Sequence, residues 1–500
     1  MELLLNNLAH GFSVALTLNN IMFCLLGCLI GTAIGVLPGI GPVATISLLL
    51  PITFGQPATT AIIMLAGIYY GAQYGGSTTA ILLNLPGEVS SVVTTLEGYK
   101  MARNGRAGAA LTIAALGSFF AGTVSTILVA ASGPLLTSVA LSFGPADYFS
   151  LMLLGLIISA VLAQGSVLKS VGMVVLGVAL GLVGTDVQTG QQRFTFGVPE
   201  LSDGVGFVSI AMGMFGIAEI ILNLERPEQR SVLAAKVGSL FLTKEEFSRA
   251  VPSVLRGTAV GSLLGILPGG GAALASFGSY MMERKMSRGR HEFGNGAIEG
   301  VAGPESANNA ASQTSFIPLL TLGIPANAVM ALMVGALIIQ GIQPGPRMVE
   351  AQPDLFWGLI ASMWVGNLML LVINLPMIGM WVKLLQVPYK YLYPSILVFC
   401  AIGVYSLSNN VFDVYQTVLF GFVGYMFSKL KMEPAPLLIG FVLGPMMEEH
   451  LRRAMLLSRG DVMVFVERPI SASMLAIAAV ALIAMLLPSL RKGKDKALSE

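Results

Sequence analysis

Charged residues are scarce in this chain of 500 residues. Asp, Glu, Lys and Arg make up 11% of it, hydrophobic residues make up 55%, and the mean hydropathy is +0.79. Soluble domains carry about 25% charged residues. The chain therefore has too few charges to cover a soluble surface, and we expect a polytopic membrane protein. The net charge of +2 gives no indication of a nucleic-acid partner.

Cysteine and histidine are also scarce, with three of each. The cysteines lack the spacing of a disulfide framework or a zinc site, and Cys24 and Cys28 are expected to be packing residues. The scattered histidines predict neither a metal site nor a Ser-His-Asp arrangement, and no P-loop for ATP hydrolysis is present. We therefore expect no enzyme and no cofactor.

Long apolar runs are plentiful, by contrast. A membrane-spanning helix needs about 20 apolar residues. Runs near that length predict about 11 spans. They lie near residues 58–85 (interrupted), 107–132, 147–164, 166–184, 205–224, 298–342 (interrupted), 355–382, 391–407, 410–428, 435–451 and 470–488.

Two further apolar segments form an internal repeat. GTAIGVLPGIG in residues 22–54 and GSLLGILPGGG in residues 257–282 are identical at six of eleven positions when Pro38 is placed over Pro268. Each copy has two apolar legs around a Pro-Gly break. The legs of the second copy, about a dozen residues each, are too short to span a bilayer. The pattern therefore predicts two re-entrant hairpins.

Basic residues gather in a few segments, near 100–106, 225–256, 284–290, 383–390, 429–431 and the C-terminal tail, which we place in the cytoplasm. Loops near 133–147, 185–203, 343–354 and 405–413 are poor in basic residues and are expected to face out. Because basic residues flank the second hairpin but not the first, the first hairpin is expected to enter the membrane from outside and the second from inside. The halves are thus expected to be inverted-topology repeats with broken helices, as in many secondary transporters.

One segment conflicts with this orientation. Residues 448–468 contain four arginines, yet they should face out. Acidic neighbours in an amphipathic helix would explain this, as would an error in the crossing at 435–451.

The expected organisation is an all-α membrane protein in four parts. Residues 1–224 form the first repeat, 225–256 a cytoplasmic linker or interfacial amphipathic segment, 257–451 the second repeat, and 452–500 a C-terminal span with a basic cytoplasmic tail.

The stretch GVAGPESANNAASQTSFIPLLTLGIP at residues 300–325 is polar within an apolar region. Its prolines prevent one unbroken helix. Polar groups at membrane depth are tolerated where protein or a water-filled cavity surrounds them, so the stretch predicts a substrate and ion site. Glu305 is expected to bind a cation or proton; capping a helix after Pro304 is the alternative.

The two Pro-Gly tips and the polar residues supply the remaining candidates. Glycine lets a ligand approach the backbone, N–H groups at a half-helix start favour an anion, and carbonyls at a half-helix end suit sodium. Interhelical hydrogen bonding is the alternative role for the polar side chains. The expected substrate-binding residues are Pro38, Gly39, Gly41, Ser77, Thr78, Thr79, Asn84, Gly269, Gly270, Gly271, Ser306, Asn308, Asn309, Thr314 and Ser315. The expected coupling-ion residues are Glu305, Asn309, Leu37 and Leu267. Glu88, after Pro86-Gly87, is expected to cap a helix at the cytoplasmic surface.

Five segments carry a family resemblance: GVLPGIGPVATISLLLPITF, NLPGEVSSVVTTLEGYKMARNGRAG, GILPGGG, PESANNAASQTSFIPLLTLGIPANAV and GALIIQGIQPGP. Over roughly residues 18–440 the chain resembles the large membrane subunit of the tripartite tricarboxylate transporters, the TctA family. The resemblance implies a multi-pass protein of the bacterial inner membrane that imports a carboxylate. It also implies a periplasmic solute-binding protein (TctC-like) and a small four-helix membrane subunit (TctB-like). Residues 312–314 and 324–326 depart from the family pattern, so the substrate stays open among citrate-like tricarboxylates, dicarboxylates and related organic acids.

Charge balance favours coupling to an ion gradient. Moving one charge against the membrane potential costs about 2.3 kcal/mol per 100 mV, so a trianion entering a negative cell costs roughly 7 kcal/mol per 100 mV. Sodium ions or protons would have to cancel that charge. The alternative is a gated anion channel or pore subunit, which would conduct without a coupling ion.

Overall fold

The computed structural model describes residues 2–37, 41–140, 142–163, 166–186, 188–225, 238–267, 271–384 and 389–486. These residues are almost entirely helical, which confirms the predicted all-α class. One short antiparallel pair of strands, β1 (Gly184–Thr185) and β2 (Gln192–Arg193), interrupts the helices, with Gly184 opposite Arg193.

The helices and short helical turns occur in the following order along the chain. Up to residue 225 they are α1 (Glu2–Ala15), α2 (Leu18–Val36), α3 (Pro42–Thr53), α4 (Ala58–Leu83), η1 (Val89–Ser91), α5 (Val92–Arg103), α6 (Ala107–Ala140), α7 (Pro145–Leu162), α8 (Val167–Gly181), η2 (Pro199–Leu201), α9 (Phe207–Ala211), η3 (Met212–Ile217) and α10 (Ala218–Glu225). After residue 243 they are α11 (Lys244–Gly265), α12 (Gly271–Met286), η4 (Arg290–Glu292), α13 (Glu299–Thr314), α14 (Phe316–Leu322), α15 (Ala328–Ile339), α16 (Met348–Ala351), α17 (Pro353–Asn374), α18 (Ile378–Leu384), α19 (Tyr389–Ser408), α20 (Val411–Lys429), α21 (Ala435–Leu457), α22 (Val464–Glu467) and α23 (Pro469–Leu486).

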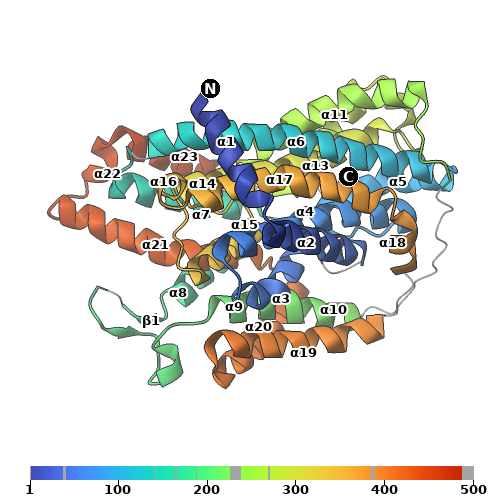
Figure 1. Cartoon of the computed structure of the whole chain (residues 1–500). Helices are drawn as coiled ribbons and strands as arrows, with labels where there is room; N and C mark the ends of the chain where they lie inside the picture. The colour runs from blue at the N-terminus through green and yellow to red at the C-terminus, as the bar shows by residue number, and fades with distance from the viewer. Residues whose placement is uncertain are drawn as a thin grey trace.

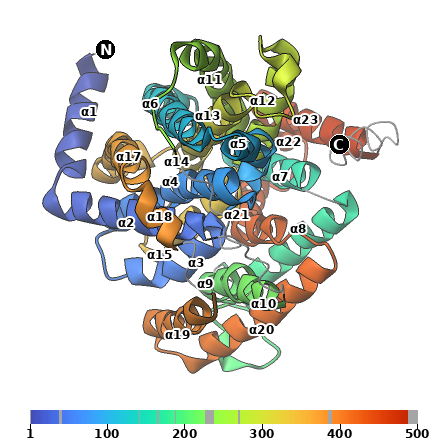
Figure 2. The same ribbon diagram turned by 90° about the vertical axis from the view of Figure 1, so that its right-hand side faces the viewer.

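Helices α4 and α13 lie at the centre of the molecule. They are surrounded by helices that include α1, α11, α8, α20 and α19 (Figure 2). Helix α4 is buried from Thr60 to Leu82, and α13 is buried along its whole length although half of it is polar. The apolar outer helices therefore enclose a polar centre, the reverse of the arrangement in a soluble protein.

The glycines of the internal repeat place helices in close contact. A Cβ atom at Gly31 of α2 would lie 2.3 Å from the carbonyl oxygen of Ile68 in α4. A Cβ atom at Gly261 of α11 would lie 2.2 Å from the carbonyl oxygen of Ala307 in α13. At the glycines four positions before and after, a Cβ atom would also collide with a carbonyl oxygen of the facing helix. Each helix pair therefore meets along a row of small residues, as membrane helices commonly do. These flanking glycines are Gly27 and Gly35 in α2 and Gly257 and Gly265 in α11.

Several predicted boundaries are wrong. Helix α4 is continuous, whereas the span at 58–85 was expected to be interrupted. Gly67, Gly71 and Gly75 are tolerated because they pack against α2, where a larger side chain would collide with the backbone. Helix α11 has 22 residues and continues through the boundary expected at residue 257, so the first apolar leg of the predicted second hairpin belongs to a longer helix than expected. The interruption expected within 298–342 is confirmed, because α13, α14 and α15 divide it.

By length and composition, five helical segments of the described chain could cross a membrane: Leu18–Val36, Ala107–Gly133, Phe207–Glu225, Pro353–Asn374 and Val411–Lys429. Shorter apolar helices lie at other predicted positions, among them Pro145–Val161, Val167–Gly181 and Pro469–Ile483. Several apolar helices thus support a polytopic membrane protein, and the count of about 11 spans stays a prediction.

Two of the segments predicted to face the cytoplasm, near 100–106 and 225–256, meet at one end of the molecule; most of the C-terminal tail lies outside the described residues. Arg106 pairs with Glu246 at 2.7 Å, and Asn104 donates a hydrogen bond to the carbonyl oxygen of Asn295. This end lies to the right in Figure 1, around α5 and α18. Which end faces the cytoplasm stays a prediction.

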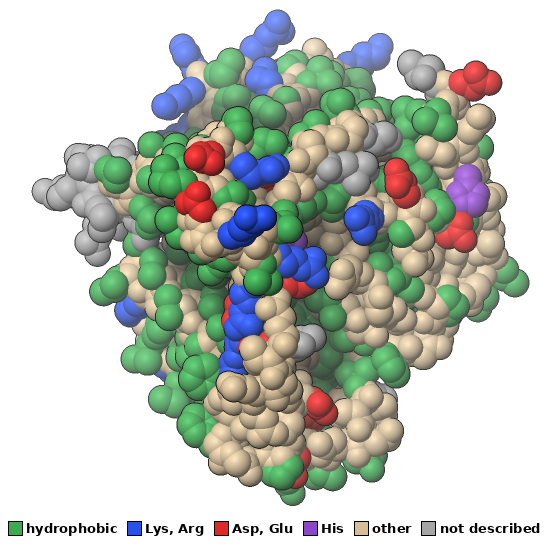
Figure 3. Space-filling view, turned by 90° about the vertical axis from the view of Figure 1, so that its left-hand side faces the viewer, with side chains coloured by type: hydrophobic (Ala, Val, Ile, Leu, Met, Phe, Trp, Pro, Cys, Tyr) green, Lys and Arg blue, Asp and Glu red, His purple; other side chains and the backbone are tan. Residues whose placement is uncertain are grey.

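The opposite end of the molecule contains residues 448–468, whose orientation stays a prediction. Arg452 pairs with Asp186 at 3.0 Å and Arg468 pairs with Asp147 at 2.5 Å, so acidic partners offset these basic charges. Figure 3 shows acidic and basic side chains close together on this face. The β1–β2 segment, which was expected to face out, joins it because Arg193 pairs with Glu448 at 2.8 Å.

Candidate functional site

The carboxylate of Glu305 lies at the centre of the buried polar region. Glu305 is 1% exposed and sits in the middle of α13. Ser77 of α4 donates a hydrogen bond of 2.5 Å to its Oε2, and the hydroxyl of Thr94 in α5 donates to its Oε1. The alternative role of a helix cap after Pro304 is wrong, because α13 begins at Glu299 and includes Pro304.

Asn309 lies one turn further along α13 and reaches a fourth helix. Its Nδ2 donates to Ser118 Oγ in α6 at 2.7 Å and to the backbone oxygen of Glu305 at 3.2 Å. Three predicted residues, Ser77, Glu305 and Asn309, therefore join in one network. Thr94 and Ser118 complete it, and sequence reasoning missed both. Thr94 lies in one of the segments that carry the family resemblance, which was the available signal.

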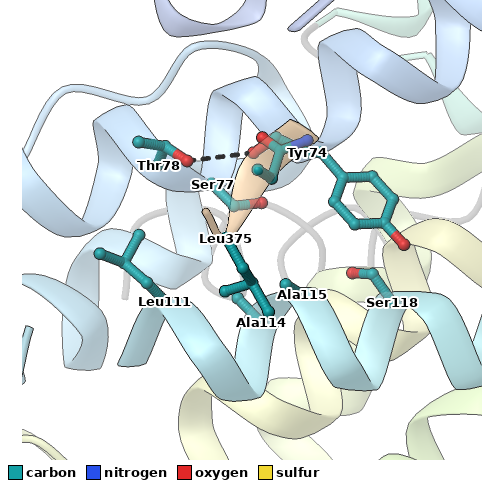
Figure 4. A pocket seen from close by; sticks show the side chains of 9 residues that line it. Tyr74, Ser77, Thr78, Leu111, Ala114, Ala115, Ser118 and Leu375 are labelled. Atoms are coloured by element: carbon teal, nitrogen blue, oxygen red, sulfur yellow. Dashed lines mark hydrogen bonds between the residues drawn. The ribbon is translucent and has the colours of Figure 1, made fainter. Parts of the chain in front are cut away.

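A small cavity adjoins this network between α4 and α6. Tyr74, Ser77 and Thr78 of α4 face Leu111, Ala114, Ala115 and Ser118 of α6, and Asn374 and Leu375 complete the lining (Figure 4). The cavity has a volume of about 10 Å³, which is enough for about one water molecule. Two polar atoms in this lining, Tyr74 Oη and Asn374 Oδ1, are buried and have no hydrogen-bond partner among the described residues.

Glu88 also contributes to the polar centre. It caps η1, where its backbone N–H donates to Ser91 Oγ at 3.3 Å, as the sequence predicted. Its side chain is not free at a surface, however. Ser90 Oγ donates to Glu88 Oε1 at 2.5 Å, and Asn308 Nδ2 of α13 donates to the same oxygen at 3.2 Å.

The remaining predicted hydroxyl groups bond to backbone carbonyls. Thr79 joins α4 to α2 by donating to the oxygen of Val36 at 2.7 Å. Three others donate within their own helical segment: Ser306 to Ala302, Thr314 to Ala310 and Ser315 to Ser312. These contacts fit the alternative role of stabilising the helix packing.

Asn84 lies apart from the centre. It is exposed and ends α4 with a φ of 59°, in the left-handed region that asparagine tolerates better than most residues. Its position is that of a helix C-cap, away from the Glu305 network.

The two Pro-Gly tips are described in part. Pro38, Gly39, Gly269 and Gly270 lie outside the described residues. Leu37 follows α2 and is buried, whereas Leu267 follows α11 and is 45% exposed. Gly41 precedes α3, and Gly271 begins α12 with a φ of 54°, close to Asn327 at the start of α15.

Glu97 holds α5 against the segment that precedes α13. Its Oε1 accepts hydrogen bonds from Gly294 N at 2.6 Å and from Tyr280 Oη at 2.9 Å. Its Oε2 accepts from Gly296 N at 2.8 Å and from Ala297 N at 3.0 Å. We call these contacts the Glu97 clamp. Because Thr94 lies one turn earlier on α5, the clamp also helps to position the partner of Glu305. Sequence reasoning missed this residue as well.

An almost all-helical chain with apolar outer helices and a buried polar centre defines a polytopic membrane protein. Residues 21–439 match the tripartite tricarboxylate transporter TctA family, and the chain belongs to this family. It is therefore a transport protein rather than an enzyme. The resemblance noted from the sequence motifs is confirmed.

Two relatives come from Agrobacterium vitis. One, described as an uncharacterized 52.8 kDa protein in the TAR-I ttuC′ 3′ region, is 61% identical over 497 residues and covers 99% of both chains. The other, described as an uncharacterized protein in the TAR-II ttuC′ 3′ region, is 62% identical over 240 residues, which are 48% of this chain and 99% of the relative. No solved structure matches the chain.

Proposed function

We propose that this chain is the large subunit of a secondary active transporter that imports a carboxylate across the bacterial inner membrane. The substrate class is a citrate-like tricarboxylate, a dicarboxylate or a related organic acid. Membership of the TctA family supports this proposal. The observation that carries it furthest is the buried Glu305 carboxylate of α13, which accepts hydrogen bonds from α4 and α5.

Glu305 is suited to bind a coupling ion. Its hydrogen bonds come from neutral hydroxyl groups, and no ion pair involves it among the described residues. A buried carboxylate without a positive partner is costly, so binding of a sodium ion or a proton stabilises it. Asn309 is placed to sense that change because it contacts the backbone oxygen of Glu305.

The substrate would bind beside this ion site. The cavity between α4 and α6 offers the hydroxyl groups of Thr78 and Ser118, which can donate to a carboxylate, whereas the single hydrogen of Ser77 is engaged by Glu305. Its small size suits a closed state, which would have to open to admit an organic acid. The Pro-Gly tips that follow α2 and α11 would complete the site with backbone groups.

The proposed architecture is a pair of inverted-topology repeats. The first contains α2, the Pro38 tip, α3 and α4; the second contains α11, the Pro268 tip, α12 and α13. Equivalent glycines at 31 and 261 pack each leading helix against the following central helix, which supports the pairing. The tips would be re-entrant, the C-terminus cytoplasmic, and a periplasmic solute-binding protein and a small four-helix subunit would act as partners.

Uptake into vesicles tests this function. The vesicles would contain this chain, the small subunit and the binding protein, with and without a sodium or a proton gradient. We expect saturable carboxylate uptake that requires a gradient. Glu305→Gln and Asn309→Ala should lose most of that uptake or change its ion requirement, whereas Glu245→Gln, at an exposed position of α11, should retain it.

Other outcomes are equally informative once membrane insertion of each variant is verified. Uptake unaffected by collapse of both gradients would contradict the proposal. Currents far above carrier rates without a coupling ion would instead establish a gated anion channel. Normal transport by both site variants would show that the network around Glu305 is structural.

A further inference from the structure

A second polar cluster adjoins Glu305 and is not explained by the ion site proposed above. We define the Glu88 cluster as Gln73 of α4, Glu88 and Ser90 of the connection between α4 and α5, and Asn308 of α13. Gln73, Ser90 and Asn308 are each at most 4% exposed. Two of these residues donate to Glu88 Oε1: Ser90 Oγ at 2.5 Å and Asn308 Nδ2 at 3.2 Å.

The Glu88 cluster has more acceptors than donors. Ser90 Oγ lies 2.5 Å from Glu88 Oε1 and 3.1 Å from Gln73 Oε1, yet a hydroxyl group has one hydrogen and cannot satisfy both oxygens. The amide oxygen of Asn308, Oδ1, is buried and has no hydrogen-bond partner among the described residues. The three side-chain oxygens thus have two donated hydrogens among them, and Asn308 Oδ1 is the one left without.

Turning the Asn308 amide would not repair this imbalance. It would place Oδ1 against the carboxylate of Glu88, so that two acceptors would meet. A proton on Glu88 would add one donor, which could reach a single oxygen. A metal cation, in contrast, attracts all three oxygens at once, and sodium is a hard cation that favours oxygen ligands.

We propose that Gln73, Glu88 and Asn308 bind a sodium ion at a site distinct from Glu305. The cluster supplies one negative charge and two neutral amide oxygens, which suits a monovalent cation better than a divalent one. Asn308 lies three residues after Glu305 on α13, so the two sites share one face of this helix. A cation at Glu88 also reduces the repulsion between the two carboxylates.

This inference rests on the proposed function for its role in transport. A dianion or trianion needs at least two or three monovalent cations for electrically balanced import. Glu305 alone accounts for one. The Glu88 site supplies a second, and it places that ion against the same central helix.

Sodium binding to the purified chain in detergent tests the site without any transport. Radioactive sodium would be titrated at constant ionic strength with choline as the replacing cation. We expect Glu88→Gln and Asn308→Ala to bind one sodium ion fewer than the wild type, or to bind it at least tenfold more weakly. Glu305→Gln should retain the site at Glu88, and Glu245→Gln should match the wild type.

Gln73→Ala keeps the inference testable if the Glu88 variant does not fold, because it removes one oxygen and leaves the cap of η1 intact. It too should weaken the site at least tenfold. Wild-type sodium binding by the Gln73 and Asn308 variants would overturn the proposal, as would equal binding of potassium. If the purified protein binds sodium at the Glu88 cluster but the vesicles take up no carboxylate, the proposed transport function is contradicted and the proposed sodium site is supported.

Discussion

Glu97→Gln tests the Glu97 clamp, which joins α5 to the chain just before α13. The carboxylate accepts four hydrogen bonds, three of them from backbone N–H groups at 2.6–3.0 Å. The fourth comes from the hydroxyl of Tyr280. Glutamine has nearly the same shape but replaces one acceptor oxygen by an NH2 group, which cannot accept. The substitution therefore removes acceptors without leaving a cavity.

The cost follows from where that NH2 group would point. Toward Gly296 and Ala297 it would face two backbone donors. Toward Gly294 and Tyr280 it would face one, because the tyrosine hydroxyl can rotate and accept. This second orientation is the better one. One buried N–H then loses its partner, at about 1–3 kcal/mol, and two bonds to a charged oxygen become neutral, at about 1 kcal/mol each. We expect a loss of about 3–5 kcal/mol in the free energy of unfolding.

Reversible denaturation in detergent micelles would measure this loss. Glu245→Gln is the matched control, because it makes the same chemical change at an exposed position of α11 and should alter stability by about 0.5 kcal/mol or less. A similarly small effect at Glu97 would show that the N–H groups at 294, 296 and 297 find other acceptors, and that the clamp does not hold this segment.

Two further predictions concern helix packing and pH. Gly261→Ala should destabilise the protein by about 1–3 kcal/mol, because its Cβ would lie 2.2 Å from a carbonyl oxygen of α13. Gly172→Ala is the control: a Cβ there would meet no other atom within 4 Å, so the substitution should be neutral or stabilising by up to about 1 kcal/mol. Equal effects in unfolding experiments would contradict the close approach of α11 and α13. Hydrogen bonds from Arg249 hold the pKa of Glu292 below its ordinary value of 4.5. Glu292 therefore adds stability above pH 4.5 that is lost as pH falls through its lower folded pKa. Glu292→Gln, which leaves the pairing of Arg249 with Glu299 in place, should flatten this part of the stability–pH curve. An unchanged curve would show that the pair does not stabilise the fold.

The sequence alone was sufficient for features that depend on composition and local pattern. The shortage of charge predicts a membrane protein, because a bilayer-facing surface needs few charged residues. The polar stretch at 300–325 predicts a buried site, because polar groups in a membrane interior must be enclosed. The repeated glycines at 31 and 261 predict equivalent helices, and both prove to be close-packing positions.

Helix boundaries depended on packing that the sequence does not display. Helix α4 passes through Gly75-Gly76 without a break, and α13 includes Pro304, although both residue types weaken an isolated helix. Tertiary packing compensates: Gly75 lets α4 approach the backbone of α2, and α13 is buried along its whole length.

The partners of the site residues were decided by the tertiary structure. Thr94 and Glu305 are 211 positions apart, and Asn308 and Glu88 are 220 apart. Helical periodicity indicates which residues of one helix share a face, but it contains no information about which other helix that face will meet. The sequence could therefore single out Glu305 as the unusual charge, while the packing of α4, α5 and α6 around α13 determined which hydroxyl and amide groups surround it.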